Sequence, residues 1–123
     1  MRTTKRSIFL DDVRNPVDVY QYTKEGIFLR NDWCIVRNYE QFTDSILEKG
    51  LPRIISFDHD LGDEHYVKPD CQEYIEKTGY DCAKWLVEYC MDHVLNLPEF
   101  YCHSMNPVGK DNIERLLNNF KKR

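Results

Sequence analysis

The sequence lacks a long run of basic residues. Its 123 residues include 17 Lys and Arg against 21 Asp and Glu, a formal net charge of -4, and the longest basic run is the terminal KKR. Because a protein that binds bulk duplex nucleic acid needs many cations along one surface, we do not expect this partner. Local positive charge would still suffice for a small anionic ligand.

Cysteine and histidine patterns of metal sites are also missing. The five cysteines are an odd number, none forms a C-x-x-C pair, and Cys34, Cys90 and Cys102 lie in apolar segments. This pattern is typical of reduced cysteines in the core of a cytoplasmic protein. The four histidines have no spacing of a known zinc site, and we expect His65 and His93 to be solvated.

No apolar run is long enough for a membrane span or for the core of a signal peptide. The sequence shows no internal repeat, low-complexity tract or domain linker, and it is 41% hydrophobic and 31% charged. We therefore expect one domain over residues 1–123 with its own core, in the cytoplasm and without membrane contact. The sequence does not indicate whether the protein is a monomer or an oligomer.

Strand and helix patterns alternate along most of the chain. Apolar runs predict strands at residues 6–10, 32–38, 53–58 and 99–104. Helical spacing predicts helices at 39–49, with Asn38 as N-cap and Gly50 as its end, at 78–96, with Thr78 as N-cap, and around Ile113 to Phe120. This order predicts a single-domain α/β three-layer sandwich with a mainly parallel sheet of about four strands.

Two other segments are predicted to be irregular. Residues 13–26 contain Pro16 and no clean helical stripe, so we expect a loop with at most one helical turn. The following GIFLR could pair with the second strand. Residues 63–77 are polar and aperiodic, and a loop of this length is typical of a lid, a binding loop or disorder.

Polar residues follow three of the predicted strands. Asp11 and Asp12 follow the first, Asp58, His59 and Asp60 follow the third, and His103 and Ser104 end the fourth. In a parallel sheet these positions converge on one edge, where α/β proteins bind ligands. Gathered carboxylates repel one another unless a cation neutralises them, so we expect bound Mg²⁺, or Mn²⁺, at this edge.

The residues alone leave alternatives open. Strand alternation would place Asp58 and Asp60 on one side and His59 on the other, although past the strand end His59 could also reach the cleft. Asp-x-Asp before glycine is also a turn motif, and His103 could be purely structural. The segment NPVGKDNI predicts a helix start that binds an anion with help from Lys110, or simply a capped helix.

The segments FLDD, SFDHDLG and CHS resemble the receiver domain of response regulators. That resemblance implies sheet order 2-1-3-4, Mg²⁺ on Asp11, Asp12 and Asp58, a phosphoacceptor position at Asp58, and a phosphoryl contact from Ser104. The chain lacks the usual fifth strand and its lysine, for which Arg14 or Lys110 could substitute.

A second resemblance is more specific. FDHDLG together with HSxNPxG and TGYDxAxWL resembles the cyclic-phosphate-processing receiver-like domains of bacteria and phages, over residues 8–117. It implies a metal-dependent phosphoesterase, a hydrolase acting on a cyclic nucleotide or on a cyclic-phosphate-ended nucleic acid. Asp58 would attack or ligate metal, with His59 or Asp60 activating water and His103 protonating the leaving oxygen. The phosphate would be positioned by Arg14, Ser104, Asn106 and Lys110.

Three other readings compete with the phosphoesterase. SFDHDLG is similar to the start of haloacid-dehalogenase phosphatases, but there the glycine directly follows the second Asp, whereas Leu61 intervenes here. A receiver-like module could instead bind a phosphorylated ligand or a protein partner without turnover, using residues 63–77 for recognition. An aspartyl-phosphate signalling receiver is the third.

Overall fold

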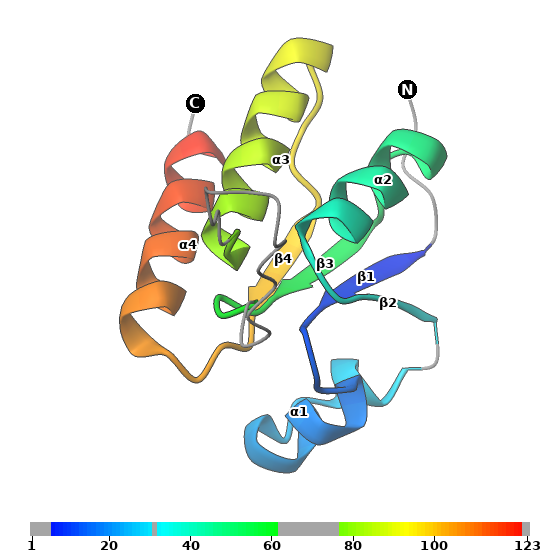
Figure 1. Cartoon of the computed structure of the whole chain (residues 1–123), viewed down its shortest axis with the longest axis vertical. Coiled ribbons are helices and arrows are strands. Elements are labelled where there is room, and N and C mark those ends of the chain that lie inside the picture. The colour runs from blue at the N-terminus through cyan, green and yellow to red at the C-terminus, as the bar shows by residue number, and fades with distance from the viewer. Residues whose placement is uncertain (1–5, 31, 62–76, 122–123) are drawn as a thin grey trace, which may run out of the picture.

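The computed structural model describes residues 6–30, 32–61 and 77–121. Four parallel strands, β1 (Ser7–Leu10), β2 (Trp33–Val36), β3 (Ile54–Phe57) and β4 (Glu99–Cys102), form one sheet in the order β2-β1-β3-β4 (Figure 1). Helices cover both faces, so the α/β sandwich and the strand order 2-1-3-4 expected from the sequence are confirmed.

The register aligns the carboxyl ends of the strands. Leu10 pairs with both Val36 and Phe57, and Phe57 pairs with Cys102, so the last residues of all four strands lie in one row. The residues that follow each strand therefore emerge side by side at one edge of the sheet. This alignment positions the candidate site.

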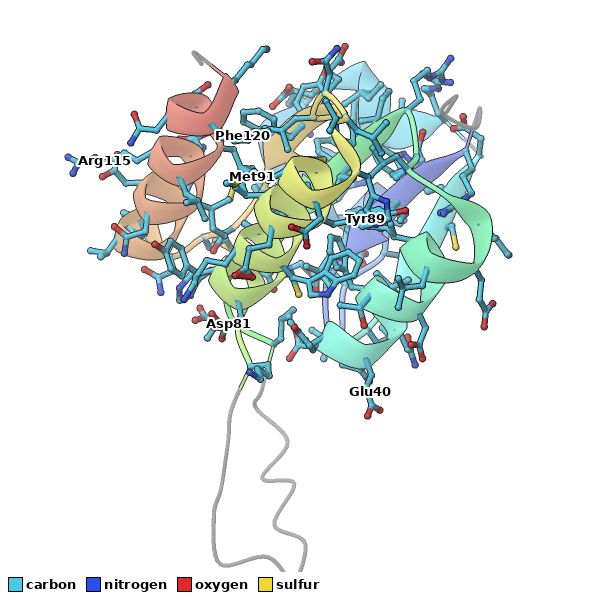
Figure 2. The ribbon with its side chains drawn as sticks, turned by 90° about the horizontal axis from the view of Figure 1, so that it is seen from above. Glu40, Asp81, Tyr89, Met91, Arg115 and Phe120 are labelled. Atoms are coloured by element: carbon cyan, nitrogen blue, oxygen red, sulfur yellow. The ribbon has the colours of Figure 1, made fainter. Side chains whose placement is uncertain are left out.

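One face of the sheet carries the main core. Helices α2 (Tyr39–Lys49), α3 (Gly79–His93) and α4 (Pro107–Lys121) lie side by side over it (Figure 2). Phe42 of α2, Leu86 of α3 and Ile113 of α4 are fully or almost fully buried against Ile55 and Phe57 of β3. The helical spacing predicts these three buried helix positions. Leu47 and Val94, which the same spacing also predicts to be buried, are 64% and 91% exposed.

The predicted starts of α2 and α3, and the predicted end of α2, are confirmed. The side chain of Asn38 accepts a hydrogen bond from the backbone N–H of Gln41, and Gly50 ends α2 with a φ of 83°. Thr78 and Asp81 form a reciprocal capping box at the start of α3. Helix α3 ends at His93, earlier than expected, because Val94 adopts a left-handed conformation with a φ of 54°.

On the opposite face of the sheet, the structure corrects two predictions made from the sequence. Residues 13–26 contain the eight-residue helix α1 (Pro16–Thr23), not a loop with at most one turn. Pro16 is the first residue of this helix, a position where the backbone N–H would have no helical partner, so proline is tolerated there. Asn15 and Asp18 form a capping box, which is a sequence signal for the start of the helix.

The segment GIFLR is not a strand. Gly26–Leu29 form a short 3-10 helix, η1, because buried Phe28 stacks on Trp33, with ring centroids 5.8 Å apart, and packs edge-on against Phe9. Phe9, Val19 and Phe28 form the smaller core of this face. Most of the predicted loop at 63–77 lies outside the described residues.

The four cysteines that the structure describes agree with the prediction of reduced thiols. Cys82, Cys90 and Cys102 are buried without disulfides, and Cys34 is half-buried. Cys71 lies outside the described residues. Burial raises the pKa of Cys90 and of Cys102 to about 11, so their thiols stay protonated at neutral pH. Among the described helices, none is long and apolar enough to cross a membrane.

Candidate functional site

Three residues that are remote in sequence meet at the carboxyl edge of the sheet. Asp11, Asp58 and His103 directly follow β1, β3 and β4, and each offers one ligand atom within 4.8 Å of the other two. All three are buried, with exposed fractions of 5% or less. The convergence of remote carboxylates expected from the sequence is therefore present.

Asp11 is held from several directions. Its Oδ1 atom accepts hydrogen bonds from the backbone N–H groups of Val13 (3.0 Å) and Arg14 (2.8 Å). Its Oδ2 atom lies 3.1 Å from Nε2 of His103 and 3.6 Å from the Arg14 guanidinium. Burial by itself would raise the pKa of Asp11, but these hydrogen bonds outweigh burial and lower it. Asp11 is therefore ionised at neutral pH.

The pKa of Asp58 is shifted in the opposite direction to that of Asp11. Burial, and then repulsion from Asp11, raise its pKa to about 7, although the charge of Arg14 and the hydrogen bond from the His59 N–H (2.9 Å) partly offset this. The Asp58 carboxyl group is thus partly protonated near neutral pH. The buried Asp11–Asp58 pair is an arrangement that a divalent cation would stabilise, and carboxylate oxygens are ligands that Mg²⁺ and Mn²⁺ prefer.

Asp12 is the third metal ligand expected from the sequence, together with Asp11 and Asp58. In the part of the chain that the structure describes, the close group contains His103 and not Asp12. Asp12 is half-buried, and its negative charge contributes to the raised pKa of Asp58. Asp12 therefore acts electrostatically on the same site.

His103 is enclosed between the sheet and its neighbours. Its ring stacks on Phe9 with centroids 4.6 Å apart and an interplanar angle of 6°, and its Nδ1 atom lies 2.6 Å from Oγ of Ser56. Burial lowers the pKa of His103 more than Asp11 raises it, so the ring is neutral at pH 7. Ser56 was not predicted, although a single polar residue inside the apolar strand IISF was a signal.

His59, Asp60 and Asn106 form a more exposed group beside the buried one. The Nδ1 atom of His59 lies 3.0 Å from Oδ1 of Asp60, which also accepts a hydrogen bond from the Asn106 side-chain amide at 3.4 Å. The His59 ring packs against Gly109, where a Cβ atom would overlap the imidazole. His59 therefore lies against the start of α4, beside Asp60, and its place in the cleft stays a prediction.

Asn106 and Ser104 organise the start of α4. The Asn106 side-chain oxygen accepts a hydrogen bond from the N–H of Gly109 at 3.0 Å, and Oγ of Ser104 accepts one from the N–H of Asn106 at 3.1 Å. Ser104 is buried, whereas Lys110 is exposed in the first turn of the helix. The capped-helix reading of NPVGKDNI is therefore confirmed, and the anion site remains a prediction.

Two further residues near the site were missed. Tyr22 of α1 donates a hydrogen bond to the His103 carbonyl at 2.7 Å and accepts one from the Arg14 guanidinium at 3.3 Å. Arg37 donates to the carbonyls of Asp11 (3.2 Å) and Arg14 (2.6 Å), which fixes the turn after β1. Tyr22 was missed because α1 was expected to be a loop.

Comparison with known proteins gives one match. The family model described as "Cyclic-phosphate processing Receiver domain" matches residues 6–119, nearly the whole chain. No curated protein and no solved structure gives a significant match. The receiver-type match agrees with the parallel sheet and leaves the haloacid-dehalogenase alternative without support. By its family match and its fold, the chain belongs to the cyclic-phosphate processing receiver domains.

Proposed function

We propose that this domain is a metal-dependent phosphoesterase that hydrolyses a cyclic phosphate, either a cyclic nucleotide or the cyclic phosphate end of a nucleic acid. The observation that carries this proposal is the buried group of Asp11, Asp58 and His103 at the carboxyl edge of the sheet. Membership of the cyclic-phosphate processing family supports the substrate class.

Asp11 and Asp58 would hold Mg²⁺ or Mn²⁺ through carboxylate oxygens, with Asp12 adding negative charge nearby. When bound, the cation neutralises charge that develops on the phosphoryl oxygens during ester cleavage. Asp11 is suited to this role because its ionised form is stabilised by three hydrogen bonds. Asp58 would lose its proton on binding, since a cation favours the carboxylate form.

His59 is our candidate for the general base. With Nδ1–H donating to Asp60 at 3.0 Å, the lone pair of His59 lies on Nε2 and is available to accept a proton from water. Asp60 would then orient the ring, and Gly109 provides the space that the ring occupies. Direct attack by Asp58, which would give an aspartyl phosphate, is the competing route.

The phosphate would be positioned by groups around this pair. Arg14 is the stronger candidate to replace the receiver lysine, because its guanidinium lies 3.6 Å from Asp11 and its charge acts on Asp58. Lys110 is exposed on α4, where it would contact only a part of the substrate that extends over that helix. Ser104 and Asn106 would contribute polar contacts at the helix start.

Incubation with defined substrates tests the proposal. Cyclic nucleotides and cyclic-ended oligonucleotides should be converted to phosphomonoesters in the presence of Mg²⁺ or Mn²⁺, and a chelator should stop the reaction. A purely binding module would retain the ligand and leave it unchanged. Unchanged substrates in both classes at saturating metal would contradict the phosphoesterase proposal.

A signalling receiver is the second candidate, because Asp58 stands at the end of β3 beside Asp11 in a receiver-ordered sheet. Acetyl phosphate would then add a phosphoryl group that Asp58→Asn prevents. Absence of any phosphorylated species by intact-protein mass spectrometry, under conditions where cyclic phosphates are cleaved, would leave the phosphoesterase as the supported function.

A further inference from the structure

Two buried serines on neighbouring strands differ in one respect. Ser7 of β1 is 1% exposed and Ser56 of β3 is 0% exposed. The Oγ atom of Ser7 has no hydrogen-bond partner among the described residues, whereas Oγ of Ser56 lies 2.6 Å from Nδ1 of His103. Ser56 is therefore paired with the histidine of the candidate site, and Ser7 serves as its natural control.

The Ser56 hydroxyl and the ionised Asp11 carboxylate, one at each ring nitrogen, favour the same position for the His103 proton. A buried O–H group that donates to nothing is unfavourable, and within the described chain Nδ1 of His103 is the acceptor in reach. If Ser56 donates to Nδ1, the neutral imidazole carries its proton on Nε2. That atom lies 3.1 Å from Oδ2 of Asp11, an oxygen that accepts the hydrogen bond.

The ring cannot easily turn away from this arrangement. The His103 side chain is 0% exposed, and it stacks nearly parallel on Phe9 at 4.6 Å. Phe28 also packs edge-on against it, with centroids 6.1 Å apart. Exchange of the two ring nitrogens would require the imidazole to rotate within a close-packed core.

We infer that Ser56 is a positioning residue that holds His103 as the Nε2–H tautomer, so that His103 donates to Asp11 and stays outside the coordination shell of the cation. This inference rests on the metal site of the proposed function and specifies its ligands. An N–H group has no lone pair for a metal, so the cation would be bound through oxygen atoms. Such a donor set favours Mg²⁺ and Mn²⁺ over Zn²⁺.

The metal-free protein provides the first test. Long-range ¹H–¹⁵N spectra of the full chain should show His103 with a protonated Nε2 and an unprotonated Nδ1 at pH 8. In Ser56→Ala the nitrogen shifts, that of Nδ1 above all, should change, because Nδ1 loses its hydrogen bond, although Asp11 still favours a protonated Nε2. Ser7→Ala should leave them unchanged, and Ser56→Thr, which keeps the hydroxyl, should restore them. A protonated Nδ1 in the wild type overturns the inference, whether or not the variants fold.

Bound Mn²⁺ provides the second test. Pulsed electron paramagnetic resonance should detect no directly coordinated nitrogen in the wild type, and Ser56→Ala should weaken Mn²⁺ binding by roughly tenfold, as for other outer-shell partners. Ser7→Ala should bind as the wild type does. A coordinated imidazole nitrogen overturns the inference but supports the metal site. Absence of Mn²⁺ binding contradicts the proposed function instead, and the tautomer measurement still decides the role of Ser56.

Discussion

The Nε2 atom of His103 lies 3.1 Å from Oδ2 of Asp11, although 92 positions separate the two residues in the sequence. Their strands, β1 and β4, are not neighbours, because β3 lies between them. Parallel pairing in register brings both residues to the same edge, together with Asp58 at the end of β3. The chemistry of the site therefore depends on the register of the whole sheet.

Replacing Asp58 should remove the metal-dependent activity. Asp58→Asn deletes one of the two buried carboxylates that would bind the cation, so turnover should become undetectable and Mn²⁺ affinity should fall by at least roughly tenfold. Initial rates with the cyclic-phosphate substrate and Mn²⁺ titrations measure both effects. Asp44→Asn, an exposed position on α2, is the matched control. Full activity in Asp58→Asn would contradict the proposed role of Asp58 as a metal ligand.

Asp58 should make the metal-free protein less stable as pH rises from about 4 to 7. The pKa of Asp58 is raised to about 7 by burial and by repulsion from Asp11, so the folded chain retains a proton that the unfolded chain releases. Stability decreases with pH wherever the folded state binds more protons. Between pH 5 and pH 8 the wild type should therefore lose about 3 kcal/mol relative to Asp58→Asn, because about two pH units of this range lie below the pKa of Asp58, at 1.4 kcal/mol per unit.

Urea unfolding in the presence of a chelator measures this difference. His103 acts in the opposite direction, because burial lowers its pKa and the unfolded chain then binds more protons near pH 6. His103 is present in both proteins, so its contribution largely cancels in the comparison. Parallel pH profiles for the wild type and Asp58→Asn would show that the pKa of Asp58 is not raised.

Gly109→Ala should impair activity more than folding. A Cβ atom at this position would overlap the His59 imidazole, so the ring must move away from Asp60 and Asn106. We expect turnover to fall by at least roughly tenfold, within the range for a displaced general base, while the circular dichroism spectrum is preserved. Gly26→Ala is the control, because nothing lies within 4 Å of its Cβ position. Equal activity of the two variants would argue against His59 as the base.

Gly79→Ala should mainly destabilise the protein. The first residue of α3 packs so closely on the turn after β3 that a Cβ atom would overlap the backbone carbonyl of Asp58, and the Gly79 N–H donates to the His59 carbonyl at 2.7 Å. Overpacking against backbone typically costs about 1–3 kcal/mol. A lower urea midpoint than that of the Gly26→Ala control is expected, and an unchanged midpoint would show that α3 can shift freely.

Much of the fold was predictable because its signals are local. The apolar runs located all four strands, and the caps Asn38 and Thr78 located the starts of α2 and α3. Helix α1 was missed because the capping box of Asn15 and Asp18 was overlooked beside Pro16. Phe28 shows a different limit: GIFL forms a 3-10 helix because this side chain packs on Phe9 and Trp33, contacts that no local pattern contains.

The sequence by itself determined which residues leave the strand ends, and hence that Asp11, Asp58 and His103 would emerge at one edge, because parallel strands all end on the same side. Only the tertiary structure decided how these residues are paired. Ser56 lies against His103, and His59 occupies the space beside Gly109. Such pairings follow from the packing of side chains between remote segments, which depends on sheet register and helix placement and is not encoded in any single stretch of the chain.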